Sequence, residues 1–428
     1  MTDNRESGSS APSADQPPLD LDLKSLANVR DPFPVYRWLR DHEPVHWSTG
    51  LNAWVVTRYA DVLEMFEQPL KFSSDRFRKV DEKYASRRPA VQAVGAVLDD
   101  WLVFRDPPDH TRLRGLLQKS FTPTHLDKSR ARVQATIDRL LDLVAERGEM
   151  DFIREFAFPL PATVIALLLG VPTEDIELIK EWSDRLAAYL GGAVHGTDNF
   201  AEARRGVTQL AEYFVTLLRS REAAPHDDLM SLMLRAEDEG QRLSREEVVA
   251  NCVLLLFAGH ETTTNLLGNG LFHLLGHPEQ TALLIRHPEL VPSAVEEFLR
   301  YDGPVPATVK VATEDVPWHG RTIRRGDMVL PFLSAANRDP RQFPEPDVLD
   351  VRRAPARHVA FAYGIHFCLG APLARLEGQL TFETLLRRLP GLALQSTTPR
   401  WKPMIFLRGL ESLAVTWNPA LAMEGGSE

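Results

Sequence analysis

The sequence predicts a mainly α-helical protein that forms one large domain with a few small β-sheets. Apolar residues recur at helical spacing through most of residues 107–275, whereas strand-like patterns occur only near residues 45–56 and after Gly303. Residues 21–417 contain no internal repeat of about 20 to 50 residues and no linker rich in Gly, Ser or Pro. We therefore expect a single helical domain over residues 21–417.

Short elements open this domain. The pattern predicts a helix at residues 33–41, two strands within residues 45–56 around a turn at residues 50–52, and another helix at residues 59–66. Residues 73–100 show no clear period. They indicate a long loop of the kind that often serves function.

Long helices fill the middle and the end of the chain. Ser244 and Glu247 form a capping-box pattern, and residues 276–278, Gly-His-Pro, supply a stop. The helix between them would run about 45 Å, and its apolar centre at residues 252–259 indicates burial on all sides. The complete set of helices predicted in this region is 107–120, 124–147, 156–169, 173–190, 198–221, 244–275 and 373–389.

Composition excludes several classes of function. The 428 residues carry 49 Lys and Arg against 59 Asp and Glu, a net charge of −10, so we expect neither nucleic acid nor a membrane as partner. The two cysteines, Cys252 and Cys368, are too few for a disulfide framework or a thiolate zinc site. Residues 1–20 lack the features of a signal peptide, and no window reaches the about 18 apolar residues of a membrane span. We expect a cytoplasmic protein with tails at residues 1–20 and 418–428.

Polar residues follow directly after the apolar centre of the longest helix. They are His260, Glu261 and three threonines at residues 262–264. A carboxylate and hydroxyls inside a core helix are unfavourable unless they have partners or a function. The alternative interpretation is a helix that emerges into solvent at this point. The zinc-protease pattern His-Glu-x-x-His is not matched, because residue 264 is threonine.

Cys368 lies where a glycine-punctuated loop turns into the helix at residues 373–389. Backbone N–H groups and the helix dipole at such a position favour the thiolate. This thiolate could be a nucleophile with His366 as its base, a redox sensor, or a single axial ligand to a metal; an inert buried thiol is the plainer alternative. For Cys252, inside an apolar run, we expect the inert thiol.

A ligand with acidic groups would need cationic partners. His110 and Arg114 lie four residues apart on one helix face, in a helix that Asp106 can cap and Pro107 can open. Together they could hold a carboxylate. Taken singly, such residues more often belong to a solvated face.

These residues together resemble a known family. Residues 361–370, FAYGIHFCLG, match the haem-binding signature of the cytochrome P-450 monooxygenases at every fixed position. Three further motifs agree in order and spacing. They are His110-x-x-x-Arg114, which resembles the propionate-binding helix, Ala258-Gly259-x-Glu261-Thr262, which resembles the oxygen-activating segment, and Glu297-x-x-Arg300 with Arg353, which resembles the family's structural ion pair.

The resemblance covers residues 21–417 and is to the soluble bacterial type of the family. It implies the P-450 fold and a role for each residue of the signature. Cys368 would be the metal ligand, the axial thiolate of haem b, with Phe361 packed beneath the ring. Gly364 and Gly370 would let the backbone approach the porphyrin closely. The resemblance further implies that the haem propionates are held by His110, Arg114, His366 and, where the family usually has an arginine, Lys310, which supplies charge without a bidentate fork.

On the opposite side of the haem, the resemblance implies that Glu261 and Thr262 relay protons to bound dioxygen. Glu297, Arg300 and Arg353 would be structural and would fix a meander at residues 337–357. His260 receives no role. Substrate contacts are expected from residues 73–100 and 191–200 and from six further residues, Ala258, Pro306, Ala307, Thr308, Ile405 and Phe406.

The expected function is a haem-thiolate monooxygenase that inserts one atom of dioxygen into a C–H or C=C bond of an apolar lipid, terpenoid, steroid or polyketide-like molecule. The chain has no flavin or nucleotide motif, so electrons would pass from NAD(P)H through an external ferredoxin and its reductase, docking near Cys368. The alternatives are a peroxide-driven peroxygenase, which would need no Glu261 and Thr262 relay, and a haem sensor without turnover.

Overall fold

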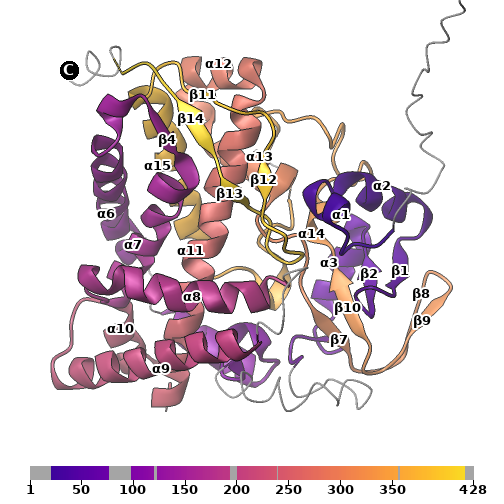
Figure 1. Cartoon of the computed structure of the whole chain (residues 1–428). Coiled ribbons are helices and arrows are strands. Elements are labelled where there is room, and N and C mark those ends of the chain that lie inside the picture. Colours follow the sequence, from indigo (N-terminus) through magenta and orange to yellow (C-terminus); the bar gives the residue numbers. More distant parts are fainter. Residues whose placement is uncertain are drawn as a thin grey trace, which may run out of the picture.

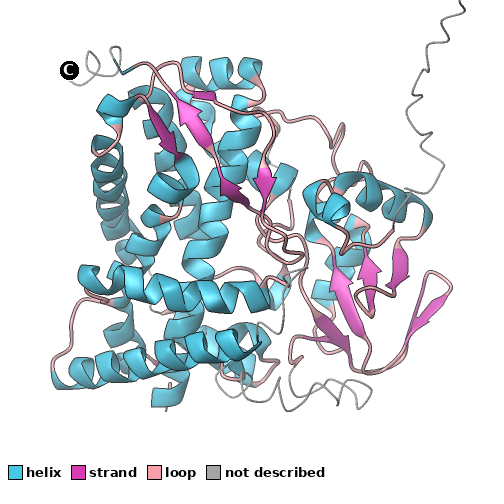
Figure 2. Cartoon of the chain, viewed as in Figure 1, coloured by secondary structure: helices cyan, strands magenta, loops and turns pink. Residues whose placement is uncertain are grey.

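The chain folds into a large helical part that lies beside a smaller part built around a β-sheet (Figure 1). The computed structural model describes residues 21–76, 98–119, 123–192, 200–238, 240–354 and 357–419. Helices dominate and every sheet is small (Figure 2). The predicted fold class is therefore confirmed. The domain bounds stay a prediction, because residues 1–20 and most of 418–428 lie outside the described residues.

The helices follow the predicted order, with ends that differ by a few residues. The described α-helices are α1 (Leu26–Arg30), α2 (Phe33–His42), α3 (Tyr59–Glu67), α5 (Asp109–Gln118), α6 (Pro123–Asp142), α7 (Pro159–Leu169), α8 (Ile176–Leu190), α9 (Phe200–Ala223), α10 (Leu229–Arg235), α11 (Arg245–Leu275), α12 (Pro278–Arg286), α13 (Val291–Asp302), α14 (Leu333–Ala336) and α15 (Ala371–Arg388). Shorter turns lie at Leu102–Phe104, Ala145–Arg147, Ile153–Ala157, Thr173–Asp175, Pro288–Leu290 and Gly364–His366.

One five-stranded sheet joins the N-terminal part of the domain to residues 310–331. Its order is β1-β2-β10-β7-β3, with β1 (Val45–Ser48), β2 (Ala53–Val56), β3 (Phe72–Ser73), β7 (Lys310–Ala312) and β10 (Met328–Pro331). All its pairs are antiparallel except β10 with β2. The other described strands form β11-β14-β4, β12-β13, β5-β6 and β8-β9, with β4 (Glu149–Asp151), β5 (Glu237–Asp238), β6 (Gln241–Arg242), β8 (Val316–Trp318), β9 (Arg321–Ile323), β11 (Ala393–Leu394), β12 (Arg400–Trp401), β13 (Leu410–Ser412) and β14 (Ala414–Thr416).

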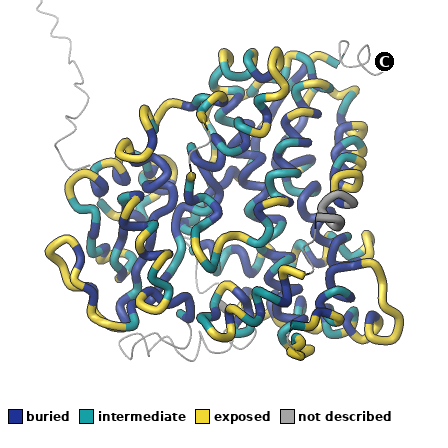
Figure 3. The backbone as a smooth tube through the Cα atoms, turned by 180° about the vertical axis from the view of Figure 1, so that it is seen from behind, coloured by how far each residue is buried: buried dark blue, intermediate teal, exposed yellow. Residues whose placement is uncertain are grey.

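The 31-residue helix α11 runs through the middle of the helical part and packs against α7, α9, α13 and α15 (Figure 1). The Ser244 side chain accepts from the Glu247 N–H, and the Glu247 carboxylate accepts from the Ser244 N–H, so the predicted capping box is present. Most of the helix is buried, and from behind the molecule its buried path is visible at the centre (Figure 3). The polar residues after Gly259 therefore stay inside the protein, and the alternative of a helix emerging into solvent is wrong.

The predicted structural ion pair ties α13 to the following meander. Arg300 donates two bonds to the Glu297 carboxylate, at 2.7 and 2.8 Å, and both side chains are 2% exposed. Arg353 Nε donates to Glu297 Oε1 at 3.1 Å. Arg300 also donates to the carbonyl oxygens of Asn337 and Pro346, so every charge in this cluster has partners.

The expected cap of α5 is wrong. The residue before α5 is Pro108, and the Asp106 carboxylate instead accepts from the Ser73 hydroxyl and the Ser74 N–H at the end of β3. Because Asp106 accepts hydrogen bonds from Ser73 and Ser74, its carboxylate does not cap α5. Elsewhere, the regular helix α7 begins at Pro159, which lacks the N–H that a preceding turn would need.

Among the described residues, none of the helices combines the length and apolar character that crossing a bilayer requires.

Candidate active site

A large cavity lies between the centre of α11 and the loop that precedes α15. It encloses about 1420 Å³ of space that no atom occupies, part of it open to solvent. One wall carries Cys368, Phe361 and His366 of the loop, and the opposite wall carries Ala258 and Thr262 of α11. The structure thus brings together two motifs that are about a hundred residues apart in the chain.

The loop before α15 holds Cys368 with its surface open to this cavity. The Cys368 N–H donates to the Phe361 carbonyl at 3.0 Å, which closes the loop. Gly364 has φ +69°, and a Cβ there would lie 2.9 Å from the Phe66 carbonyl oxygen, so only glycine fits. A Cβ at Gly370 would lie 4.0 Å from Cys368 Sγ and would occupy space beside the sulfur.

The protein alone does not favour the thiolate, contrary to the expectation from the helix terminus. Removal from water raises the pKa of Cys368, while the N–H groups of Gly370 and Ala371 and the charges of Arg114 and Arg375 only partly oppose this rise. A metal ion bound to the sulfur would supply the missing stabilisation, because a coordinating thiol loses its proton. Cys252 is fully buried in α11 and its pKa is also raised by burial, as expected for an inert thiol.

Three basic residues, His110, Arg114 and His366, line the edge of the cavity, and the predicted propionate ligand Lys310 lies beside them without lining it. The rings of His110 and His366 lie 4.3 Å apart, and Ser74 Oγ lies between His366 Nε2 at 3.0 Å and Lys310 Nζ at 2.6 Å. Arg114 donates to the carbonyl of Phe367 at 2.7 Å. Burial lowers the pKa of His110 to about 4, that of His366 to about 2 and that of Lys310 to about 8, and in each case except Lys310 the neighbouring cations add to this effect.

These basic groups fit the acidic edge of a haem. Neither ring nitrogen of the buried His110 has a hydrogen-bond partner among the described residues. Such atoms are costly to bury unless a ligand completes them. Two propionates would provide the missing acceptors and would relieve the repulsion among His110, His366, Lys310 and Arg114. The cavity above Cys368 and this cluster together therefore match haem b.

On the α11 side, the two predicted relay residues point in different directions. The Thr262 hydroxyl lines the cavity and donates to the Ala258 carbonyl at 2.7 Å. Glu261 is 3% exposed and does not line the cavity; its carboxylate accepts from Lys402 Nζ at 2.6 Å. Burial raises the pKa of Glu261, but the charges of Lys402 and His260 and the hydrogen bonds from Lys402 and Asn265 together outweigh this effect and hold the pKa below its usual range.

The predicted substrate contacts do not all meet in this cavity. Ala258 and Thr308 line it, whereas Ala307 pairs with Phe332 in a β-bridge. The N–H of Phe406 donates to the Gly191 carbonyl at 3.0 Å. Residues 77–97 and 193–199, which belong to the loops expected to contact substrate, lie outside the described residues.

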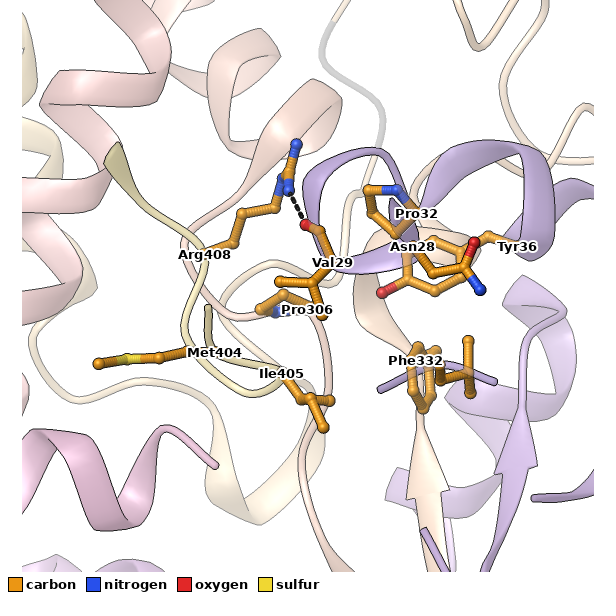
Figure 4. A pocket seen from close by; sticks show the side chains of 10 residues that line it. Asn28, Val29, Pro32, Tyr36, Pro306, Phe332, Met404, Ile405 and Arg408 are labelled. Atoms are coloured by element: carbon orange, nitrogen blue, oxygen red, sulfur yellow. Dashed lines mark hydrogen bonds between the residues drawn. The ribbon is translucent and has the colours of Figure 1, made fainter. Parts of the chain in front are cut away.

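Pro306 and Ile405 line a smaller, separate pocket beside α1 and α2 (Figure 4). Arg408 borders this pocket and donates to the Val29 carbonyl at 3.0 Å, the bond drawn in Figure 4. The same guanidinium donates to the buried Asp302 carboxylate at 2.6 Å. Beside this pocket, Arg408 therefore links α1 to the end of α13.

Sequence reasoning missed several residues that line the large cavity. On α11 they continue the face of Ala258 and Thr262 at helical spacing, a signal that could have identified them as Leu254 and Leu266. The missed apolar residues from other elements include Leu102, Val103, Ile165, Leu299, Val305 and Leu333. The buried Glu377 of α15 also lines the cavity beside Thr263, and burial raises its pKa to about 8.

An accessible cysteine, a cluster of buried and half-buried basic groups and a largely apolar space next to a polar helix turn are the features of a haem-thiolate oxidoreductase. Comparison with known proteins specifies the class further. The profile of the family Cytochrome P450 matches residues 192–286 and 283–405. The chain is 41% identical to the vitamin D(3) 25-hydroxylase of Pseudonocardia autotrophica, over 94% of this chain and 97% of that protein.

Two further relatives agree. The chain is 37% identical to the polyketide biosynthesis cytochrome P450 PksS of Bacillus subtilis, over 90% of this chain and 96% of that protein. It also matches the solved structure of P450BioI in complex with hexadec-9Z-enoic acid ligated acyl carrier protein, at TM-score 0.84 and 37% identity over 92% of this chain and 99% of that one. The chain belongs to the cytochrome P450 family, whose members are haem b monooxygenases, and the predicted resemblance is confirmed.

Proposed function

We propose that this cytochrome P450 inserts one oxygen atom of dioxygen into a C–H bond of an extended, largely apolar molecule of the lipid, steroid or polyketide type. The observation that supports this most is the lining of the space above Cys368. Apart from Cys368, the basic residues at its edge and four further residues, Thr262, Thr263, Thr308 and Glu377, the residues that line this space are apolar. Such a lining binds hydrocarbon and leaves few groups to orient a polar substrate.

The relatives support the same class of substrate. One is named a vitamin D(3) hydroxylase, one a polyketide biosynthesis enzyme, and one was solved with a fatty acyl chain carried by a protein. All three names describe molecules dominated by hydrocarbon. We therefore propose a substrate with a long or fused hydrocarbon body for this chain as well.

The protein's own residues hold the cofactor and supply protons. Cys368 would ligate the haem iron, and His110, Arg114, His366 and Lys310 would bind the propionates. Bound haem supplies the activation of dioxygen. The Thr262 hydroxyl carries a proton at the cavity wall, and Glu261, the next residue toward the N-terminus of α11, would replace that proton. Electrons would come from NAD(P)H through a separate ferredoxin and its reductase.

A substrate screen tests this function. Compounds with a hydrocarbon body should shift the haem absorption from its low-spin to its high-spin position. NADPH with a ferredoxin and reductase should then yield a product that contains one atom from labelled dioxygen. A product formed with hydrogen peroxide alone, and none with the electron-transfer proteins, would identify a peroxygenase instead. Haem without any ligand-dependent shift or turnover would identify a sensor.

A further inference from the structure

A group of potential metal ligands lies at the contact between α8 and α11, apart from the haem cavity (Figure 1). Asp184 of α8 and His260 and Glu261 of α11 each offer one ligand atom, and these three atoms lie within 4.8 Å of one another. None of the three residues lines the haem cavity. The packing of two helices that are distant in the sequence therefore creates this group.

His260 has a ring nitrogen that the protein leaves without a partner. The residue is 2% exposed, and its Nδ1 lies 2.9 Å from the Leu256 carbonyl oxygen. Because a carbonyl oxygen only accepts, Nδ1 holds the proton and Nε2 presents a lone pair. Within the described part of the chain, Nε2 has no hydrogen-bond partner. A buried acceptor without a partner is costly, and a metal ion on Nε2 would remove that cost.

The spacing of the three ligand atoms suits a small divalent ion. Three atoms within 4.8 Å of one another share a point that lies within about 2.8 Å of each, and zinc bonds to nitrogen and oxygen are about 2.0 to 2.2 Å long. Each atom would therefore have to approach by less than about 1 Å. Asp184 is exposed, so its side chain can turn toward the buried His260 and Glu261.

The types of ligand favour zinc. One imidazole nitrogen with carboxylate oxygens is a set that zinc accepts, whereas magnesium and calcium prefer oxygen ligands alone. Zinc usually has four ligands, so a water would complete the set. His260 and Ser183 line a small pocket with about 230 Å³ of space that no atom occupies, part of it open to solvent. Ser183 Oγ is also buried without a partner among the described residues and could bond such a water.

Two lysines lie close to this group and would oppose a cation. Lys402 donates to Glu261 Oε1 at 2.6 Å, and Asn265 donates to the same oxygen at 3.4 Å. The charge of Lys180 on α8 acts on Asp184, as does that of Lys402. An ion on Glu261 Oε2 would leave the bonds to Oε1 in place, and the lysine charges would limit its affinity.

We propose that Asp184, His260 and Glu261 form a zinc site that joins α8 to α11. The ligands are His260 Nε2, one carboxylate oxygen of Asp184 and Oε2 of Glu261, with water in the fourth position. The inference goes beyond the proposed function, because neither haem binding nor oxygenation requires this ion. Its tests need no substrate and no electron supply, so a failure of the proposed oxygenation would leave them unaffected.

Equilibrium dialysis of the full-length haem protein, purified without a histidine tag, against zinc chloride tests the site. The wild type should bind a zinc ion that His260→Phe and Asp184→Asn bind at least about tenfold more weakly, since even the loss of a group that only supports a ligand costs 10- to 100-fold. Asp184→Asn changes an exposed residue and should keep the fold if His260→Phe does not. Equal zinc affinities in the wild type and Asp184→Asn would overturn the proposal.

Removal of Lys402 should have the opposite effect. Lys402→Met should tighten zinc binding by roughly tenfold, the effect of removing a positive charge about 5 Å from a divalent ion even at the dielectric constant of water. Lys402→Arg should retain the wild-type affinity. A loss of loop structure alone would leave the affinity of Lys402→Met unchanged or reduce it, and either result would overturn the proposal.

Two matched controls separate this site from other zinc ligands on the surface. Glu177→Gln removes an exposed carboxylate seven residues before Asp184 on α8, and Arg400→Met removes a cation two residues before Lys402 that is 78% exposed and pairs with Glu411. Both should bind zinc as the wild type does. An affinity change in either control as large as that in the matched site variant would overturn the proposal.

Thermal unfolding followed at the haem absorption band provides a second readout. A ligand that binds the folded state raises the unfolding temperature, so zinc should stabilise the wild type more than Asp184→Asn. Magnesium at the same concentration should stabilise neither. The reduced carbon monoxide spectrum of each variant shows that haem and its thiolate ligand are intact. An equal rise with zinc in the wild type and Asp184→Asn would assign the effect to other residues and overturn the proposal.

Discussion

The guanidinium of Arg375 lies 4.7 Å from the centre of the Phe361 ring. Two hydrogen bonds to Glu296, at 2.7 and 2.9 Å, fix this position, and His358 approaches the same carboxylate at 3.1 Å. Arg375 also lies close enough to Cys368 to lower the pKa of its thiol in part. A fixed positive charge therefore lies against the Phe361 ring and close to Cys368.

Arg375→Met should lower the reduction potential of the haem, because removing a nearby positive charge favours the ferric state. The expected change is on the order of 60 mV, the tenfold step of a one-electron couple. A spectroscopic redox titration of the purified protein measures it. Arg375→Lys keeps the charge and should retain most of the potential. Equal potentials in the wild type and Arg375→Met would show that this charge does not act on the iron.

Glu377→Gln should make the protein less sensitive to alkaline pH. Burial raises the pKa of Glu377 from 4.5 to about 8. A carboxyl group with a raised pKa in the folded state contributes stability that is fully present below pH 4.5 and is lost as the pH rises toward 8. The wild type should therefore lose thermal stability over this range, and Glu377→Gln should lose less.

Thermal unfolding followed at the haem absorption band across this pH range provides the measurement. Glu383→Gln, on the exposed side of α15, is the matched control and should behave as the wild type does. Parallel pH profiles for the wild type and Glu377→Gln would mean that the pKa of Glu377 is not raised in the folded protein.

Lys310→Met should accelerate haem loss. Lys310 is 4% exposed and lies in the buried basic cluster with His366 and Ser74. A hydrogen bond to a charged group contributes about 1.5 to 3 kcal/mol, which corresponds to roughly a tenfold to hundredfold change in rate. Haem transfer to excess apomyoglobin gives this rate directly. Lys71→Met, which removes an exposed lysine from the same sheet region, should change nothing. A rate equal to that of the wild type would remove Lys310 from the propionate site.

Thr262→Ala should separate electron consumption from product formation. Thr262 of α11 lines the cavity beside Ala258 and carries an exchangeable proton on its hydroxyl. Without it, more of the electrons should leave as hydrogen peroxide, and proton-dependent product formation should fall by roughly a hundredfold or more. Peroxide and product are measured per NADPH. Thr264→Ala, buried in the same helix but away from the cavity, should stay coupled.

The parts of the fold that depend on local signals could be predicted. The capping box at Ser244 fixes the start of α11, and the glycines around Cys368 fix the loop that presents the sulfur. Both signals are contained in fewer than about ten neighbouring residues. The family signature then placed His110 and His366 in one cluster, and their rings do meet in the structure.

Contacts between distant segments could not be predicted in the same way. Lys402 lies 141 residues from Glu261, and neither sequence neighbourhood indicates the other. The Lys402–Glu261 pair depends on how the loop between β12 and β13 packs against the end of α8. Asp106 shows the same limit, because its sequence position suits a helix cap while the packed sheet offers it Ser73 and Ser74. Pro306 and Ile405 likewise lie beside α1 through tertiary packing alone.

The contact between Arg408 and Val29 has a consequence for the N-terminal segment. Because Arg408 donates hydrogen bonds to the Val29 carbonyl and to Asp302, a protease that trims the chain up to Ser25 would leave both bonds in place. A cut a few residues further on would release the last turn of α1 and expose Arg408 and Asp302 to water. The segment around Val29 therefore holds α1 against Arg408 and the end of α13. Its resistance to limited digestion reports whether this contact is intact.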